Sequence, residues 1–410
     1  MSDAFALFDS ARQRTMGLHV IQSSDKPLNI RPASLRDPRS IPPRRWLYGT
    51  VVVRGYVTVV VAPGGVGKTS WSMAVAASVA QGKGIIGDHV HTQANVLVCN
   101  LEDPEDEFDR RLAACMIHHN LDNEDIGGRL FVLNGRERRL VMASLDIDGM
   151  TIVYPDKDAM MAKIRAENIG LVVVDPFVNS HELEENSNPH INAAARTWAE
   201  IADATGCGII LVHHTRKNAT AGDIDSARGA SALIGASRVA LTITAMAPEE
   251  AAEFGIPEKD RRLHIRVDDG KANLSPPADK ARWMRLVSIN LGNGTPEYPK
   301  GDNVQAIEQW EPPSVWKSLS NEDCNAALDA IQDGPTPGSK YTSSRAGRGA
   351  QTRWAGRVLM NMFDLNDAQA TKVIATWLRT GLIEEVDYFD QDQRKDRKGL
   401  AVNNAKRPSV

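Results

Sequence analysis

Val57-Thr58-Val59-Val60-Val61-Ala62-Pro63-Gly64-Gly65-Val66-Gly67-Lys68-Thr69 joins an apolar, β-branched run to a glycine-rich loop that ends in a Lys-Thr pair. An amphipathic helical segment follows through Ala80, so strand, loop and helix occur in the order that a P-loop requires. The glycines let the backbone curl until its N–H groups converge on phosphates, and the helix N-terminus adds positive potential. The stretch therefore predicts a phosphate-binding loop on the edge of an α/β sheet.

Within this loop, individual side chains have distinct expected uses. Lys68 is expected to reach the β- and γ-phosphates of ATP, and the Thr69 hydroxyl to ligate Mg²⁺. The first glycine of the consensus is Ala62 here, at a position that opens the loop and accepts a small residue. The alternative is a glycine-rich turn with an accidental lysine, which the flanking strand and helix disfavour. The residues predicted to bind nucleotide are Pro63, Gly64, Gly65, Val66, Gly67, Lys68, Thr69 and Ser70.

Further apolar runs alternate with longer helical stretches along the chain. Several runs are apolar throughout rather than at alternate positions, as expected for strands covered by helices on both faces. The pattern predicts an α/β fold with a mostly parallel sheet, and residues 263–287 predict an antiparallel edge. The predicted strands are 57–61, 95–99, 130–133, 171–174, 208–212 and 239–243.

Two of these runs end on carboxylates. Glu102 follows the strand at 95–101, where ligands gather in open α/β sheets, and it can orient an attacking water. The next residue, Asp103, is interpreted as the N-cap of a helix with Pro104 at its first position. Asp175 ends the run 171–174 as in a Walker B strand, which predicts that it holds Mg²⁺ through water. The alternatives are a solvated surface glutamate and a buried strand that happens to end in aspartate.

A third run, 208–212, ends in His213-His214. A histidine at such a strand tip can contact the γ-phosphate and report hydrolysis to the next loop, and His214 is the stronger candidate. Adjacent strand residues point to opposite faces, so a shared metal ion is not expected. The alternative is one core histidine and one exposed histidine.

Charge is distributed unevenly over the 410 residues. The chain has 48 Lys and Arg against 52 Asp and Glu, a formal net charge of −4, which excludes a strongly basic coat protein. Residues 1–50 carry +4, residues 51–335 carry −13 and residues 336–410 carry +5. Four widely spaced cysteines indicate neither a zinc site nor disulfides, so a reduced, cytoplasmic setting is expected. No run of about 18 apolar residues predicts a membrane span.

The composition changes along the chain predict four regions. Residues 1–45 form a basic arm or linker, 46–292 an ATPase domain, 293–319 a connector without periodicity, and 320–410 a small domain. Helices at 321–331, 353–363 and 366–380 followed by a hairpin give the order of a winged helix. Its basic side chains suit duplex or fork DNA, and the alternative is a protein-docking domain with Trp354 and Trp377 in its core. The basic residues are Arg345, Arg348, Arg353, Arg357, Lys372, Arg379, Arg394, Lys395, Arg397 and Lys398.

Taken in order, the P-loop, Glu102-Asp103-Pro104, Asp175-Pro176 and the stretch from His213 to Lys217 resemble the RecA-like ATPases. More narrowly, residues 42–290 resemble the RepA-type hexameric replicative helicases of plasmids and related phage ATPases. The resemblance implies a RecA-like core in a homo-hexameric ring, with ATP and Mg²⁺ at each subunit interface. It also implies that Glu102 is the catalytic carboxylate, Asp175 the Walker B acid and His214 the sensor.

The same resemblance supplies two residues that act on a neighbouring subunit. It implies that Arg238 is an arginine finger, so that Glu102, Lys68, His214 and Arg238 form the catalytic set. Asp269-Gly270-Lys271-Ala272-Asn273 is similar to a segment of DnaB-type helicases that gives further basic contacts in trans. Asn273 replaces the arginine of that segment, so Lys271 is a nucleotide-binding candidate with a plain turn lysine as the alternative.

Nucleic acid has an expected place in this scheme. The polar loop 215–227 follows the sensor strand, where RecA-like motors face the pore, and Arg216, Lys217 and Arg228 are candidate phosphate contacts. The alternative is an exposed mobile loop. The acidic loop 179–192 is expected to gate the nucleotide or to pack on a neighbour.

Three functions fit the sequence. The first is an ATP-dependent helicase or translocase that moves on single-stranded DNA through a ring. The second is an ATP-switched DNA-binding regulator or helicase loader without unwinding activity. The third, a KaiC-like signalling ATPase without nucleic acid, is disfavoured by the basic ends of the chain. The acidity of residues 51–335 weakens the first, because a strand-threading channel must then be basic only at its lining.

Overall fold

The structure, a computed structural model, describes residues 30–214, 230–275, 281–313, 319–346, 350–391 and 393–409. The chain divides into two units, Met1–Pro43 and Arg44–Val410. In the first unit, the described residues are exposed and contain the short 3-10 helix η1 (Pro38–Ser40). The candidate DNA contacts Arg216, Lys217, Arg228 and Arg348 lie outside the described residues.

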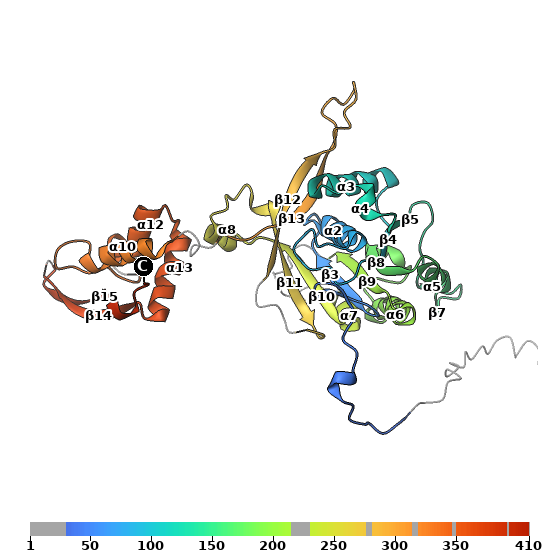
Figure 1. The fold of residues 1–410 in the computed structure, drawn as a ribbon, viewed down its shortest axis with the longest axis horizontal. Coiled ribbons are helices and arrows are strands. Elements are labelled where there is room, and N and C mark those ends of the chain that lie inside the picture. The colour runs from blue at the N-terminus through green and yellow to red at the C-terminus, as the bar shows by residue number, and fades with distance from the viewer. Residues whose placement is uncertain are drawn as a thin grey trace, which may run out of the picture. The chain divides into compact units, whose positions relative to one another are not determined.

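Within the described residues, nine strands form one sheet in the order β13-β12-β11-β10-β3-β9-β8-β4-β5 (Figure 1). The six strands from β10 to β5 in this order are parallel, and the three at the other edge pair antiparallel. The expected α/β fold with a mostly parallel sheet is confirmed. The strands are β3 (Val57–Ala62), β4 (Asn95–Asn100), β5 (Leu130–Asn134), β8 (Ile169–Asp175), β9 (Gly208–His214), β10 (Val239–Ala245), β11 (His264–Ala272), β12 (Arg282–Asn290) and β13 (Asn303–Gln309).

Helices cover both faces of the parallel strands, as their continuous apolar runs predict. On one face, α2 and α3 pack on alternate strand residues such as Val60 and Val173. On the other face, α5, α6 and α7 pack on the intervening residues, such as Val59 and Val172 (Figure 1). The helices are α2 (Lys68–Gln81), α3 (Glu105–His119), α4 (Asn123–Ile126), α5 (Lys157–Ala166), α6 (Asn188–Thr205), α7 (Ala230–Ala236) and α8 (Pro248–Phe254).

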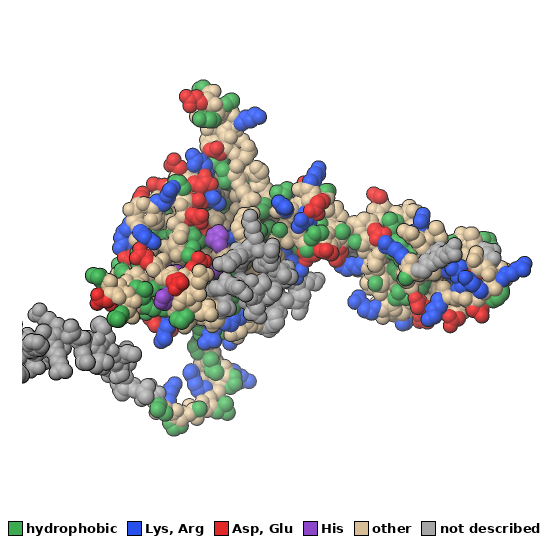
Figure 2. All heavy atoms as spheres, turned by 180° about the vertical axis from the view of Figure 1, so that it is seen from behind, with side chains coloured by type: hydrophobic (Ala, Val, Ile, Leu, Met, Phe, Trp, Pro, Cys, Tyr) green, Lys and Arg blue, Asp and Glu red, His purple; other side chains and the backbone are tan. Residues whose placement is uncertain are grey.

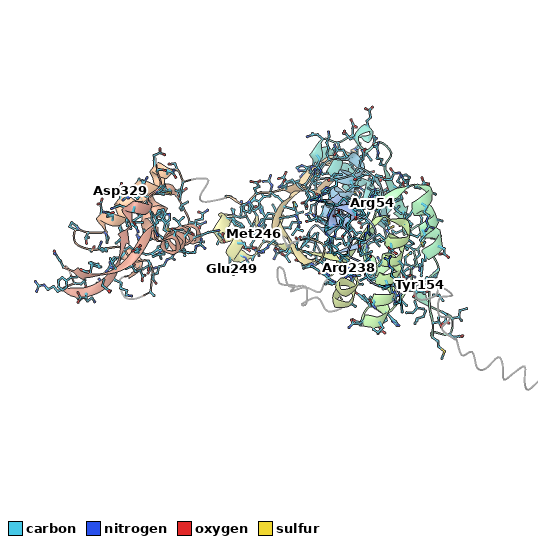
Figure 3. The ribbon with its side chains drawn as sticks, turned by 60° about the horizontal axis from the view of Figure 1, so that its bottom comes forward. Arg54, Tyr154, Arg238, Met246, Glu249 and Asp329 are labelled. Atoms are coloured by element: carbon cyan, nitrogen blue, oxygen red, sulfur yellow. The ribbon has the colours of Figure 1, made fainter. Side chains whose placement is uncertain are left out.

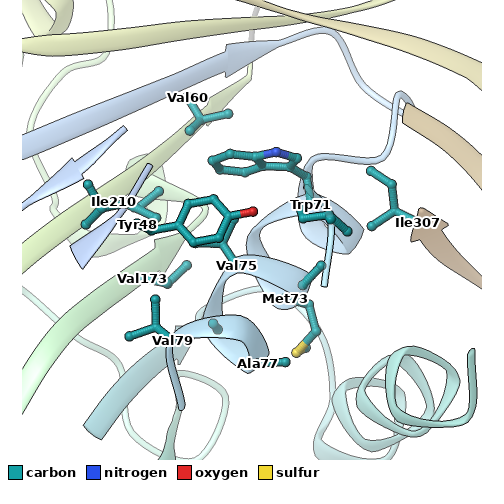
Figure 4. Packing of buried hydrophobic residues seen from close by; sticks show 14 of the residues in the cluster. Tyr48, Val60, Trp71, Met73, Val75, Ala77, Val79, Val173, Ile210 and Ile307 are labelled. Carbon is teal, nitrogen blue, oxygen red and sulfur yellow. The ribbon is translucent and has the colours of Figure 1, made fainter. Parts of the chain in front are cut away.

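Helix α2 differs from its predicted amphipathic character. Every residue from Trp71 to Ala80 is buried, because the sheet, α3 and the edge strand β13 enclose the helix. Trp71 lies in a cluster with Tyr48, Val60 and Ile307 (Figure 4). A helix buried on all sides carries small and apolar residues all round, so the one-sided pattern expected of a surface helix is absent.

The antiparallel edge predicted for residues 263–287 is present as β11 and β12, but it continues further. Residues 293–319 were predicted to be a connector, and that expectation is wrong at β13 (Asn303–Gln309), which pairs with β12 along its whole length. Four of the seven residues of this edge strand are polar, and they do not alternate regularly with the apolar ones, so its sequence gives a weak strand signal. The sheet therefore extends past residue 292.

Short elements complete the larger unit. A hairpin of β1 and β2 precedes β3, and a second two-stranded sheet lies between β5 and α5. Among the described residues, no helix is long and apolar enough to cross a membrane. These elements are β1 (Trp46–Tyr48), β2 (Val52–Val53), β6 (Ser144–Leu145), β7 (Ile152–Val153), η2 (Phe177–Ser180) and η3 (Arg261–Leu263).

The C-terminal residues form helices followed by a hairpin around a core of their own. Trp354 and Trp377 are buried in that core. The helix predicted at 353–363 is broken: α11 ends at Arg353 and α12 begins at Gly356, where a Cβ would lie 2.2 Å from the Trp354 ring. The elements are α10 (Asn321–Asp333), α11 (Ala350–Arg353), α12 (Gly356–Phe363), α13 (Asp367–Thr380), β14 (Ile383–Asp390), β15 (Lys395–Val402) and η4 (Asn404–Lys406).

Candidate active site

The carboxyl ends of four neighbouring strands bring most of the predicted site residues together. Ala62, which leads into the P-loop, pairs in register with His214 of β9. Asn100 of β4 pairs with Asp175 of β8, and the next residue, Leu101, donates its N–H to the Asp175 carbonyl at 2.9 Å. Since parallel strands end at one edge, the P-loop, Glu102, Asp175 and His214 share this edge of the sheet.

The loop backbone adopts the conformation that its glycines permit. Gly65 and Gly67 have φ values of +77° and +85°, in the left-handed region that favours glycine. Gly67 is also the N-cap of α2 and gives no side-chain cap, which leaves the N–H groups of the first turn available to an anion. A Cβ at Gly67 would lie 2.7 Å from Leu286 of β12, so the loop is packed against a strand more than 200 residues away in sequence.

Lys68 folds back onto the backbone of its own loop. Its side chain is buried, and Nζ donates to the carbonyls of Ala62 at 3.1 Å and Pro63 at 2.6 Å. Burial lowers the pKa of Lys68 to about 8, although the nearby carboxylates of Asp175 and Glu102 act in the opposite direction. A phosphate would supply the charge partner that this ammonium lacks within the loop.

Thr69 and Asp175 present two oxygen groups side by side. Burial raises the pKa of Asp175, and a hydrogen bond from Thr69 and the positive charge of nearby groups oppose that rise. Ser72 lies next to them, with Oγ at 3.5 Å from Asp175 Oδ2. A hydroxyl and a carboxylate are ligands that Mg²⁺ accepts together with phosphate oxygens and water, so these residues fit the predicted metal. No cluster of three or more His, Cys, Asp or Glu that could hold an ion by itself occurs among the described residues.

Glu102 is exposed at the mouth of a small cavity next to this pair. The cavity has a volume of about 30 Å³, room for a water molecule, and Thr69, Asn100 and Asp175 also line it. Asn100 fixes the turn that carries Glu102: its side chain donates to the Asp103 carbonyl at 2.9 Å and accepts the Asp103 N–H at 3.2 Å. Asn100 was not among the site residues predicted from the sequence, although its position directly before Leu101-Glu102 was a usable signal.

Asp103 does not cap the following helix as predicted. Helix α3 begins at Glu105 with Pro104 as its N-cap residue, and no side chain accepts from its first turn. The Asp103 carboxylate instead lies 3.1 Å from the guanidinium of Arg111, which also contacts Glu107 at 3.2 Å. Proline shifts the helix start by one residue, which leaves Asp103 to hold Arg111 beside the cavity. Arg111, like Asn100, was not among the site residues predicted from the sequence.

The two histidines at the end of β9 have different surroundings. His213 is buried beside Phe177, with ring centroids 6.2 Å apart, and burial lowers its pKa to about 4. His214 is exposed at the strand tip, where partial burial and then Lys68 lower its pKa. The geometry matches the alternative of one core and one exposed histidine, and it keeps His214 at the edge that carries the P-loop.

Arg238 and Lys271 lie on the other side of the sheet from the P-loop, where the parallel strands begin. Arg238 directly precedes β10, whose first residue, Val239, pairs with Thr58 at the start of β3 (Figure 3). Lys271, near the end of the antiparallel strand β11, donates to the carbonyls of Ile234 at 2.8 Å and Gly235 at 3.2 Å. Burial lowers the pKa of Lys271, and the charge of Arg238 contributes. Neither residue joins the P-loop of its own chain.

Comparison with known proteins adds a family similarity. Residues 24–220 match the family model described as an AAA domain. This span contains the P-loop, Glu102, Asp175 and His214, so the match and the geometry together support an ATPase.

Solved structures give weaker similarities. A structure described as an ATPase domain has 11% identity and a TM-score of 0.40, covering 61% of this chain and 85% of that one. The RadB recombinase has 13% identity and a TM-score of 0.38 over 63% and 92%, respectively. A DnaB-like replicative helicase, described with its primase interactions, has 12% identity and a TM-score of 0.39 over 57% and 56%. Similarities of this strength carry no conclusion about activity, ligands or assembly.

Proposed function

We propose that this protein is an ATP-dependent DNA helicase or translocase of the RepA type, a ring of RecA-like subunits that hydrolyses ATP at subunit interfaces. The observation that carries the proposal is the placement of its charged groups at the two ends of the parallel strands. The side of the sheet where these strands end is called the carboxyl edge, and the side where they begin is called the amino edge. Lys68, Glu102 and Asp175 lie at the carboxyl edge, and Arg238 and Lys271 lie at the amino edge. A closed ring can set the amino edge of one subunit against the carboxyl edge of the next.

On the carboxyl edge, each residue has a role that its position permits. Lys68 leaves the loop carbonyls and neutralises the β- and γ-phosphates. Thr69 and Asp175 would hold Mg²⁺, which supplies charge neutralisation on the phosphates when it is bound. Glu102 orients the attacking water at the cavity that it lines, and His214 senses the γ-phosphate from the tip of β9.

On the amino edge, the positive groups are proposed to contact the nucleotide of a neighbouring subunit. Arg238 is exposed, and no carboxylate of the described residues forms an ion pair with it. A guanidinium supplied in trans stabilises transition-state charge only in the assembled ring, which couples hydrolysis to assembly. Lys271, adjacent to it, adds a second positive charge to the same surface.

DNA is the proposed partner of the ring and of the C-terminal domain, whose helices and hairpin follow the order of a winged helix. The alternative function, an ATP-switched DNA-binding regulator or loader, is favoured by the −13 charge of residues 51–335. A pore that threads a single strand needs a basic lining, which the regulator does not require.

One pair of assays separates these functions. ATP hydrolysis is measured with and without single-stranded DNA, and strand displacement is then measured on a forked duplex. The helicase predicts stimulated hydrolysis and displacement. Stimulation without displacement would favour the regulator or loader, and hydrolysis that does not respond to DNA would contradict the motor.

A further inference from the structure

A cavity of about 570 Å³ lies along the first half of β15 in the C-terminal hairpin, between this strand and the segment 342–346. Four basic side chains and two acidic ones line it, and hydroxyl groups of the segment complete the wall. Figure 2 shows Lys and Arg side chains gathered at the end of the C-terminal region. The charged lining residues are Arg353, Lys395, Arg397, Lys398, Glu385 and Asp396.

The basic side chains of this cavity outnumber the carboxylates that pair with them. Asp390 is buried and serves two guanidiniums: Arg397 donates to Oδ2 at 3.1 Å, and Arg353 lies at 3.5 Å from the same oxygen. One carboxylate therefore balances two arginines. Arg353 Nη1 and Nη2 are buried and have no hydrogen-bond partner within the described part of the chain, so the site holds donors without acceptors.

Two further basic residues of the cavity are exposed lysines. Lys395 and Lys398 project from β15, and neither forms an ion pair with the described residues. Of the two acidic residues, Glu385 is engaged by the hydroxyl of Ser343, and Asp396 is exposed next to Lys395. The cavity therefore presents two unpaired lysines, together with hydroxyl groups, to a ligand of opposite charge.

We propose that this cavity binds the phosphates of a polynucleotide backbone, so that the β14–β15 hairpin rather than helix α13 anchors the C-terminal domain on nucleic acid. Lysine, arginine and hydroxyl donors are the groups that contact phosphate oxygens without reading sequence. The inference rests on the proposed function only in taking DNA as the partner, because the cavity is separate from the ATPase site.

Helix α13 is less suited to this contact. It carries Lys372 and Arg379 among mostly neutral residues, with Asp367 at its first turn. Arg345, which could have added to its charge, lies 3.6 Å from the Trp354 ring centroid and pairs with Asp367 at 2.6 Å. Its guanidinium is therefore committed within the domain.

The test uses full-length protein with the double substitution Lys395→Ala and Lys398→Ala, and Arg379→Ala on α13 as the matched control. All three side chains are exposed, so folding is expected to survive, and thermal denaturation checks this. Binding of a fluorescent duplex is measured against salt concentration without ATP. Loss of two phosphate contacts is expected to weaken binding about tenfold and to lower the log–log salt slope by about 1 to 2.

The possible outcomes are distinct. Arg379→Ala weakening binding while the double variant binds as wild type would overturn the proposal, as would wild-type protein that binds no duplex. Inorganic phosphate is the second probe: stabilisation by phosphate that the duplex does not compete with would assign the cavity to a free anion instead. Basal ATP hydrolysis is expected to be unchanged in the double variant. If duplex binding depends on Lys395 and Lys398 but DNA does not stimulate hydrolysis, the proposed phosphate site is supported and only the motor function is contradicted.

Discussion

Arg238 donates its backbone N–H to the carbonyl of Val57 at 3.4 Å, at the end of β3 opposite to the P-loop. The six residues of β3 span about 20 Å, so the Arg238 side chain is separated from its own Lys68 by the length of the strand. An arginine in this position can act on a nucleotide only if another subunit presents one.

The first prediction follows from this separation. Arg238→Ala is expected to lower ATP hydrolysis about 10³-fold while nucleotide binding persists, because the finger acts on the transition state. Lys68→Ala is also expected to be inactive. Mixing the two variants should restore part of the activity, since some interfaces then pair an intact P-loop with an intact Arg238.

The mixing experiment has a clear control and a clear contradiction. Arg262→Ala removes an exposed arginine from η3 and should neither lose activity nor change the outcome of mixing. The proposed role of Arg238 in a neighbouring active site would be contradicted if Arg238→Ala alone were fully active. It would also be contradicted if the mixture were no more active than its components.

The second prediction concerns the proton on Lys68. Its pKa is lowered to about 8 in the nucleotide-free protein, so the neutral amine becomes populated as pH rises through 8. Phosphate favours the charged form, and ATP binding near pH 8 to 9 is therefore expected to take up protons. Calorimetric titration in two buffers of different ionisation enthalpy measures the uptake, and Lys68→Met should abolish it.

The same shift predicts a stability change with a defined sign. A folded-state pKa below the unfolded value near 10.5 means that the unfolded chain binds more protons between pH 8 and 10.5. The Lys68 contribution to the free energy of unfolding therefore rises across this window. A wild-type minus Lys68→Met difference that is flat with pH would contradict the buried, partly neutral lysine.

The third prediction tests the catalytic carboxylate. Glu102→Gln keeps the turn fixed by Asn100 and removes only the negative charge at the cavity mouth. Hydrolysis is expected to fall about 10²- to 10⁴-fold with ATP affinity retained, as for loss of a general base. Single-turnover hydrolysis provides the measurement. Glu105→Gln, an exposed carboxylate in the first turn of α3, is the matched control, and equal losses in both variants would count against a specific role for Glu102.

The location of the candidate site could largely be predicted from the sequence because local patterns encode it. Val57–Thr69 carries strand, loop and helix signals in one stretch, and buried parallel strands ending in Asp175 or His214 are visible as apolar runs. Their convergence follows from a general property of parallel sheets. The roles of the individual residues remain predictions that the experiments above test.

Other features depend on contacts that no local pattern records. The polar edge strand β13 is stabilised by pairing with β12 and by packing of Ile307 on the buried side, so its own residues give a weak signal. The position of Arg238 depends on β10 lying next to β3, which is a matter of strand order. At the break between α11 and α12, the Trp354 ring occupies the space that a Cβ of residue 356 would take, a contact that only the folded chain shows.

The last prediction separates stability from function at Asp175. Burial raises the pKa of this carboxyl above its unfolded value, so its contribution to the free energy of unfolding falls as pH rises above the unfolded pKa and the buried group ionises. Asp175→Asn removes the buried charge and retains a group that can accept from Thr69. We expect the melting temperature without nucleotide to rise by about 2–4 °C at pH 7.5 and Mg²⁺-dependent hydrolysis to be lost. Asp158→Asn, an exposed carboxylate in the first turn of α5, should change neither. A lower melting temperature for Asp175→Asn would mean that the ionised carboxylate stabilises the fold through its neighbours, and retained Mg²⁺-dependent hydrolysis would remove it from the metal site.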